Sequence, residues 1–370
     1  MARIRTRRVR CGGKQPVRRR AEPSVASIEF IALVALLVAE HAPGSINFSG
    51  EKTTIKITLI HNPSAGDESQ PSGDRIVELI QAAGHKVKYQ SSKDKDWKKA
   101  LKKPCDMVAV AGGDGTVGKV VRRLVGSPSP IAILPIGTAN NIAHAMGFTG
   151  RALEPLIMEW ESARRLNFDI GEAEGPWGSS YFIEGFGVGL FAATILNIDG
   201  TNTPISREDE ITRVLRILKE QLQKNRAKKL EVRLDDQDLS GDYVLLQALN
   251  IRYVGPNLDL APNADTNDGL LDVVLLPRGE ERKLSRYLTS CITGKNVKAK
   301  LAVHRGRQLK IEWDGSPIHI DDKPWRMDNK GKRARSNSID VKIAPHSVVF
   351  LCPQKTRRRP RRQTSAGRSA

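Results

Sequence analysis

The chain has 370 residues, of which 39% are hydrophobic, and a formal net charge of +19 at pH 7. A chain of this size and apolar content has enough apolar residues for two hydrophobic cores, which excludes a wholly disordered protein. We therefore expect a two-domain soluble protein. Four widely separated cysteines lack the spacing of a metal site and indicate reduced thiols in a cytosolic-type protein.

The positive charge is concentrated at the two ends of the chain. Residues 1–20 hold nine Lys or Arg and residues 355–370 hold seven, without any acid, which leaves +3 for the rest. Such ends favour an anionic surface, either phospholipid or nucleic acid. Solvated disordered ends are an equal alternative. No aromatic residue interleaves with these cations, so no specific nucleic acid is expected as a partner.

Residues 1–52 are expected to be a disordered basic extension with a short apolar segment, Phe30–Ala39. This segment is too short to span a bilayer, which needs about twenty apolar residues. Three interpretations stay open: an incidental or misassigned extension, a short membrane-seeking helix, or an export signal. Whether the extension belongs to the mature protein is therefore left undecided.

Residues 53–164 alternate short apolar runs with helical patterns. Strands are predicted at 54–61, 86–91, 107–110 and 131–134, with amphipathic helices between them. This alternation predicts an α/β domain with a doubly wound parallel sheet, which binds ligands at the carboxyl ends of its strands.

Two glycine loops follow the last two of these strands. The first, Gly112–Thr116, reads GGDGT, and the second lies within LPIGTANNIA at 134–143. Strand, glycine loop and helix together present backbone N–H groups to an anion. Asp114 adds a carboxylate, and Thr116 is expected to cap the helix. The alternative is an ordinary tight turn between strand and helix.

Residues 165–353 consist largely of short alternating segments separated by Gly, Pro and Asn-Asp. They predict a β-rich, largely antiparallel second domain. A long amphipathic helix is expected after Ser206, with an apolar stripe for core packing or, less strongly, lipid contact. A further helix is expected at 281–293. Residues 354–370 are expected to be a basic disordered tail.

The two glycine loops together resemble the catalytic domain of the diacylglycerol kinase-like lipid kinases. NAD kinases and phosphofructokinases share the first loop, so the second is the more specific. The segments FDIGEAEG, YFIEGFGVG, DGLLDVVLL and IHIDDKPW also resemble this family. The resemblance runs from about Thr53 to Cys352 and is closest to the minimal bacterial form.

The resemblance implies an ATP- and Mg²⁺-dependent kinase that phosphorylates a hydroxyl of a membrane lipid of diacylglycerol or sphingoid type. The nucleotide would bind between the two domains of a cytoplasmic protein, peripheral to the inner face of the membrane. Asp114 is predicted to organise Mg²⁺·ATP. The predicted nucleotide-binding residues are Asn62, Ser91, Gly112, Gly113, Asp114, Gly115, Thr116, Gly137, Thr138 and Asn140.

The resemblance also implies a structural Mg²⁺ held by Asp265, Asp268 and the carbonyl of Leu270. Closely spaced carboxylates and backbone carbonyls are suitable ligands for such a hard cation. The alternative is an ordinary Asn-Asp-Gly turn between two strands.

Two positions depart from the family pattern. On the helix after the GGDGT loop, Lys119 stands where the family has a Glu. Near the end of the chain, Asp321-Asp322-Lys323 stands where the family has Asp-Gly-Glu. That Glu serves the family as general base, and a charged ammonium cannot accept a proton. Asp322 is the predicted substitute. The alternatives are a catalytically weakened nucleotide- or lipid-binding protein and, less favoured, an NAD kinase-like enzyme; a homo-oligomer stays open.

Overall fold

The computed structural model describes residues 54–103, 105–148, 150–198, 206–295, 297–325 and 337–354. The basic extension, the basic tail and the predictions made for them lie outside these residues. Every element described below belongs to the unit Thr53–Ala370.

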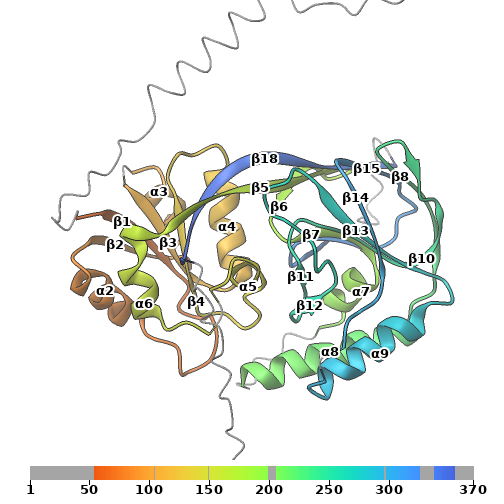
Figure 1. Cartoon of the computed structure of the whole chain (residues 1–370), viewed down its shortest axis with the longest axis horizontal. Coiled ribbons are helices and arrows are strands. Elements are labelled where there is room, and N and C mark those ends of the chain that lie inside the picture. The colour runs from red at the N-terminus through yellow and green to blue at the C-terminus, as the bar shows by residue number, and fades with distance from the viewer. Residues whose placement is uncertain are drawn as a thin grey trace, which may run out of the picture. The chain divides into compact units, whose positions relative to one another are not determined.

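Four parallel strands form the sheet of the first domain in the order β2-β1-β3-β4 (Figure 1). They are β1 (Lys56–His61), β2 (Lys86–Ser91), β3 (Met107–Gly112) and β4 (Ile131–Pro135). The helices between them are α2 (Gly73–Ala82), α3 (Trp97–Ala100) and α4 (Asp114–Leu124). All six residues of β3 are buried, as expected for a strand covered on both faces. The predicted α/β class is confirmed.

The strand register brings the ends of these four strands to one edge. His61 pairs with both Ser91 and Ala111, and Ala111 pairs with Leu134. The loops that follow the strands therefore emerge side by side, although the chain separates them by up to about seventy residues.

The rest of the sheet is antiparallel apart from the pairing of its last strand with β4, which confirms the β-rich second domain. Its strands are β5 (Arg164–Gly175), β6 (Gly178–Phe182), β7 (Gly185–Gly189), β8 (Lys228–Leu234), β9 (Gln237–Asp238), β10 (Gly241–Leu249), β13 (Leu271–Pro277), β14 (Ala302–Gly306), β15 (Gln308–Glu312), β16 (Ile318–Ile320), β17 (Lys323–Trp325) and β18 (Ser338–Cys352). A separate ribbon pairs β11 (Tyr253–Val254) with β12 (Leu258–Asp259).

The long strand β18 joins the two parts of the sheet (Figure 1). Its first half pairs with β15, and its last residues pair in parallel with β4. Val348 and Phe350 are buried in the same hydrophobic cluster as β1, β3 and β4. The end of the chain's last strand therefore belongs to the core of the first domain.

Five further helices cover the sheet or connect its strands. They are α5 (Asn141–Ala145), α6 (Leu153–Met158), α7 (Leu190–Leu196), α8 (Arg207–Lys224) and α9 (Glu281–Ile292), with a 3-10 turn at Trp160–Ser162. The hydroxyl of Ser206 accepts a hydrogen bond from the Asp209 backbone N–H at 3.1 Å, so the predicted start of α8 is confirmed. Among the described residues, no helix combines the length and apolarity needed to cross a bilayer.

Candidate active site

The first glycine loop is a sharp turn from β3 into α4. Gly113 is the N-cap residue of α4, and Asp114 and Thr116 lie in its first turn. The prediction that Thr116 caps the helix is therefore wrong; the N-cap lies three residues earlier, at Gly113, and Thr116 is a buried residue of the first helical turn. The turn presents the backbone N–H groups at the start of an eleven-residue helix to the carboxyl edge of the sheet.

The two glycine loops touch each other. A Cβ atom placed on Gly137 would lie 2.2 Å from the Cα atom of Gly113. No side chain fits between the two backbones, so glycine at position 137 is required for the approach. The close contact between the two loops therefore depends on the glycines in their sequences.

Asp114 joins the first loop to the helix that follows the second. Its carboxylate accepts hydrogen bonds from the backbone N–H groups of Asn141 and Ile142, both at 2.9 Å. It therefore caps α5. Burial raises the pKa of Asp114 to about 6, these hydrogen bonds oppose the rise, and the nearby charge of Asp321 adds to it.

The polar residues of the second loop have different surroundings. Asn140 adopts a left-handed backbone conformation, and its side chain bonds to the backbone N–H and carbonyl of Gly137 at 3.1 and 2.7 Å. Its side chain shapes the loop. Thr138 is half-exposed and lines a cavity described below.

Asn62 and Ser91 close short turns at the same edge of the sheet. The Asn62 side-chain oxygen accepts a bond from the Ser64 backbone N–H, and the Ser91 hydroxyl accepts one from Lys93, both at 3.2 Å. The structure thus brings all the predicted nucleotide-binding residues to one edge.

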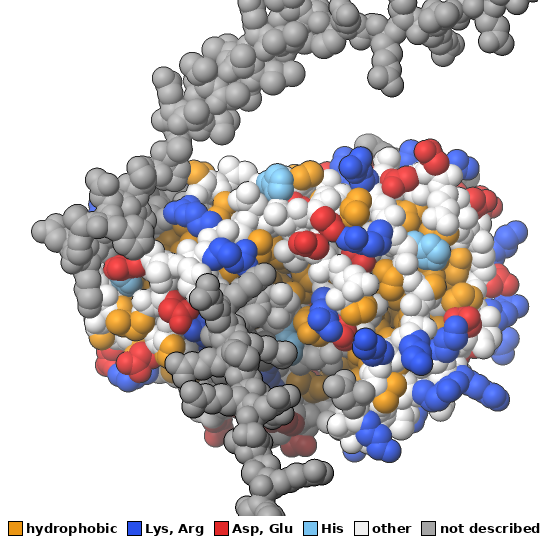
Figure 2. All heavy atoms as spheres, in the orientation of Figure 1, with side chains coloured by type: hydrophobic (Ala, Val, Ile, Leu, Met, Phe, Trp, Pro, Cys, Tyr) orange, Lys and Arg blue, Asp and Glu red, His pale blue; other side chains and the backbone are white. Residues whose placement is uncertain are grey.

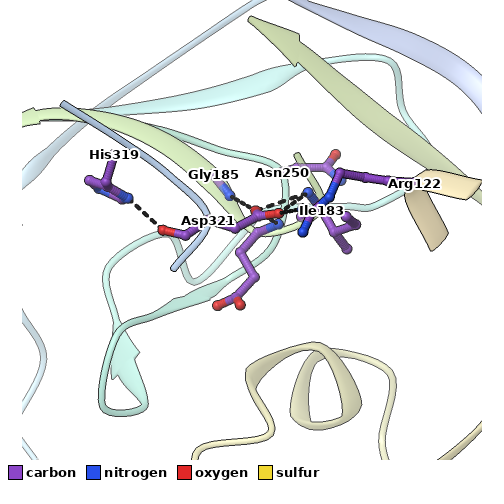
Figure 3. Close-up of polar contacts among 7 residues, drawn as sticks. Arg122, Ile183, Gly185, Asn250, His319 and Asp321 are labelled. Atoms are coloured by element: carbon purple, nitrogen blue, oxygen red, sulfur yellow. Dashed lines mark hydrogen bonds and ion pairs between the residues drawn. The ribbon is translucent and has the colours of Figure 1, made fainter. Parts of the chain in front are cut away.

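Asp321 is an anchor between elements (Figure 3). Its carboxylate accepts backbone hydrogen bonds from residues 183–185, the shortest from Glu184 at 2.9 Å. It also pairs with the Arg122 guanidinium of α4 at 2.5 Å, and both side chains are largely buried. The pKa of Asp321 is raised by burial, while the charge of Arg122 opposes the rise. This contact links α4 of the first domain to the β16–β17 turn.

His319 holds the backbone of this turn from the other side. Its Nδ1 lies 2.8 Å from the Asp321 carbonyl oxygen, and its Nε2 lies 2.9 Å from the side-chain amide of Gln247. Gly187 lies beside this pair, and any side chain there would collide with the His319 ring and with the Gln247 amide. Burial lowers the pKa of His319 to about 4, and the hydrogen bond to the Asp321 carbonyl opposes this shift.

Glu184 is a buried carboxyl that the sequence analysis did not select. Its side chain accepts a hydrogen bond at 2.9 Å from the amide of Asn141, and the residue is 8% exposed. Burial raises the pKa of Glu184 well above its usual range, and the charges of Asp114 and Asp321 raise it further. A signal was present in the sequence, because Glu184 is the one charged residue in the run YFIEGFGVGLF.

A cavity of about 340 Å³ lies against these carboxyl groups. One part of its lining is apolar and comes from α7 and the residues just after it, from α8, and from the end of β11 with the loop that follows: Phe191, Ile195, Ile198, Ile211, Val214, Leu218, Val254 and Pro256. The other part is polar and includes Thr138 of the second glycine loop, His319 and the carboxyl groups of Asp114, Glu184, Asp321 and Asp322. The cavity therefore suits a molecule with an apolar body and a polar head.

The two lysine departures lie on the surface. Lys119 is exposed on α4, and Lys323 is exposed at the start of β17. Asp322 is exposed too, but it also lines the cavity, and its carboxylate lies 2.8 Å from the position of a Cβ atom on Gly115. Asp322 thus lies directly over the first glycine loop.

The segment 265–270 forms tight turns away from this cavity. Asp265 and Asp268 accept hydrogen bonds from the backbone N–H groups two residues later, and Asp268 also pairs with Arg305. Within the described ranges, no three His, Cys, Asp or Glu side chains gather as they would around a metal ion. As arranged here, the turn does not fit a metal site, because a guanidinium neutralises Asp268. Magnesium binding at Asp265, Asp268 and Leu270 stays a prediction.

Two family models match the chain. Residues 56–173 match the diacylglycerol kinase catalytic domain, and residues 203–349 match the YegS C-terminal NAD kinase beta sandwich-like domain. A diacylglycerol kinase of Mycobacterium tuberculosis is 25% identical over 288 residues, covering 72% of this chain and 88% of that protein. One of Bacillus subtilis is 23% identical over 264 residues, covering 68% and 84%.

A similar fold occurs among solved structures. The crystal structure of a diacylglycerol kinase from Bacillus anthracis superposes with a TM-score of 0.58 at 17% identity. The match covers 82% of this chain and 98% of that one.

Proposed function

We propose that this chain, which belongs to the diacylglycerol kinase-like lipid kinases, transfers the γ-phosphate of Mg²⁺·ATP to a hydroxyl of a diacylglycerol or sphingoid-type membrane lipid. The observation that carries the proposal is the cavity with apolar walls that ends among carboxyl groups beside the two glycine loops. A lipid kinase needs both parts, because the acyl chain must leave water while the hydroxyl meets a phosphate.

The nucleotide phosphates would rest on the backbone of Gly112–Thr116, with Gly137 and Thr138 beside them. Asn62 and Ser91 end neighbouring strands at the same edge and would contact the nucleotide from there. Asn140 would act by holding the second loop in shape. Phosphoryl transfer depends mainly on such positioning and on neutralising phosphate charge.

Asp114 is the carboxylate that we assign to Mg²⁺·ATP. Each of its oxygens accepts one backbone hydrogen bond and keeps a second lone pair. The metal would neutralise charge on the phosphates when it is bound with ATP. Asp322, over Gly115, is the second carboxylate that would face the nucleotide.

The lipid would enter from the side of α7 and α8. Ile211, Val214 and Leu218 line the cavity, so the apolar stripe of α8 serves the cavity as well as the core. The enzyme would work as a peripheral protein at the inner face of the membrane, where ATP and its lipid substrate meet.

Two other functions remain as rivals. Lys119 and Lys323 favour a binding protein with weakened catalysis, whereas an NAD kinase-like activity is supported mainly by the first glycine loop. The test is to incubate the purified chain with γ-labelled ATP and Mg²⁺, presenting diacylglycerol, sphingosine or NAD in turn. We expect label in extracted lipid. Label in NADP would support the second rival, and bound nucleotide without transfer would support the first.

A further inference from the structure

The position that supplies the general base in the family holds a lysine here. Lys323 is exposed at the start of β17, and its ammonium cannot take a proton from a lipid hydroxyl. Asp322, its neighbour, also lines the cavity, but it is exposed and its carboxylate lies over Gly115 of the nucleotide loop. A lipid kinase with this arrangement needs a carboxyl group that faces the lipid.

Glu184 is a carboxyl group that faces the cavity in which we place the lipid. It lines the cavity together with Phe191 and Val254 of the apolar wall. Its residue is 8% exposed, so bulk water has little access to the carboxyl group. Asp114 lines the same cavity. Glu184 and the carboxylate that we assign to the nucleotide therefore face one cavity.

The fold holds Glu184 in place on three sides. The Asn141 amide donates to its carboxyl group at 2.9 Å. Its backbone N–H donates to Asp321 at 2.9 Å, and its carbonyl accepts from the Asn250 backbone N–H at 2.9 Å. Figure 3 shows Asp321 accepting backbone hydrogen bonds from Ile183 and Gly185, the residues on either side of Glu184 in the chain. A group fixed in this way needs no rearrangement before it reacts.

From this geometry we propose that Glu184 is the general base of the lipid kinase reaction, an inference that rests on the proposed function. In its ionised form, the Glu184 carboxylate accepts the proton of the lipid hydroxyl as the hydroxyl oxygen bonds to the γ-phosphorus of ATP. The bond from that phosphorus to the β,γ-bridging oxygen breaks, and ADP leaves with the electron pair. Asp322 then serves the nucleotide side of the site.

The experiment compares turnover in variants of the full-length chain. Glu184→Gln keeps an oxygen for the Asn141 bond but removes the basic carboxylate. We expect kcat for the lipid to fall about 10²-fold or more, the usual range for losing a general base, while KM for ATP stays within about twofold. Asp322→Asn should instead raise KM for ATP. Glu174→Gln, an exposed carboxyl on β5, is the matched control and should retain full turnover.

The outcomes separate this inference from the proposed function. A wild-type chain that labels no lipid would overturn both. A wild-type chain that labels lipid, with a Glu184→Gln variant within about threefold of it, would overturn the role of Glu184 alone. So would a larger fall in kcat for Asp322→Asn than for Glu184→Gln.

A second variant covers the case in which Glu184→Gln fails to fold. Glu184→Asp keeps the charge and withdraws the carboxylate by one methylene group. We expect kcat to fall about tenfold or more at unchanged KM for ATP, and thermal unfolding of the same sample checks the fold. If Glu184→Asp folds and keeps full turnover, the reaction does not depend on the position of the Glu184 carboxylate, and the proposal is wrong.

Discussion

Asp114 caps α5, and the same carboxylate is the one that we propose for Mg²⁺·ATP. We expect Asp114→Asn to abolish lipid phosphorylation. The amide cannot accept both backbone hydrogen bonds, and leaving a buried N–H unpaired costs about 1–3 kcal/mol. The free energy of unfolding should therefore fall by about that amount, as measured by denaturant titration.

The control for this variant is Asp106→Asn. Asp106 also accepts a backbone hydrogen bond, from Lys56 at 2.7 Å, but it precedes β3 at the opposite end of the strand. The Asp106→Asn variant should be somewhat less stable than the wild type and should keep its lipid kinase activity. An active Asp114→Asn variant would contradict the assignment of Asp114 to the nucleotide.

His319 makes stability depend on pH. Its pKa is near 4 in the folded chain and near 6.5 when unfolded, so the unfolded state binds more protons between these values. His319 therefore contributes stability above pH 6.5 that is lost as pH falls toward 4. The full difference is about 3 kcal/mol. Asp322 is the charged neighbour that opposes this effect.

The measurement compares the free energy of unfolding at pH 7.5 and pH 4.5 in the wild type and in His319→Gln. The variant should lose less stability on acidification, by about 2–3 kcal/mol. His304→Gln, at a half-exposed position on β14, serves as the control. Equal losses in all three proteins would show that His319 does not carry the pH dependence.

At the scale of elements, α8 lies between the core and the cavity. Val214 faces the cavity, whereas Arg216, two residues later, is exposed. Val214→Trp should fill part of the lipid space and lower kcat/KM for a long-chain diacylglycerol about tenfold or more, with KM for ATP unchanged. Arg216→Trp places the same side chain on the outer face and should have little effect. Equal kinetics in both variants would place the lipid elsewhere.

The turn at 265–270 poses a different question, because Arg305 of β14 occupies the place of a cation. It contacts Asp268, and its Nε lies 3.4 Å from the buried carboxylate of Asp272. If Arg305 takes the place of the predicted magnesium, Mg²⁺ and EDTA should leave the melting temperature of the wild type unchanged. In Arg305→Ala the two carboxylates lose their partner, so the chain should be less stable and Mg²⁺ should raise its melting temperature. A wild-type chain destabilised by EDTA would support the predicted magnesium site.

The sequence predicts the α/β elements and the glycine loops well, because local periodicity and glycine spacing determine them. It does not predict what Glu184 contacts. The Asn141 amide and the Asp321 carboxylate reach Glu184 from about 40 and 140 residues away. Nor does it predict that β18 returns to pair with β4. Such contacts depend on which strands pair in the sheet, and local sequence periodicity does not determine the pairing of strands that are far apart in the chain.

We expect charge to determine how the folded chain approaches the membrane that would hold its lipid substrate. Lys and Arg side chains gather along α8 and α9 (Figure 2), and exposed examples are Arg216, Lys224, Arg282 and Arg286. These helices also pack on each other beside the cavity. Two sources of attraction to an anionic membrane therefore exist: this helical surface and the basic ends of the chain.

We expect the basic ends to dominate, because sixteen of the sixty cations lie in residues 1–20 and 355–370 without any acid. Each cation near an anionic bilayer contributes about 1 kcal/mol, and added salt screens it. Sedimentation with vesicles of phosphatidylserine and phosphatidylcholine should show binding that weakens with salt and weakens again when both ends are deleted. The charge-reversed variant Arg282→Glu/Arg286→Glu, with intact ends, is the control and should bind almost as well as the wild type. If the truncated chain binds fully and the helix variant does not, the surface of α8 and α9 holds the enzyme at the membrane and the prediction for the ends is wrong.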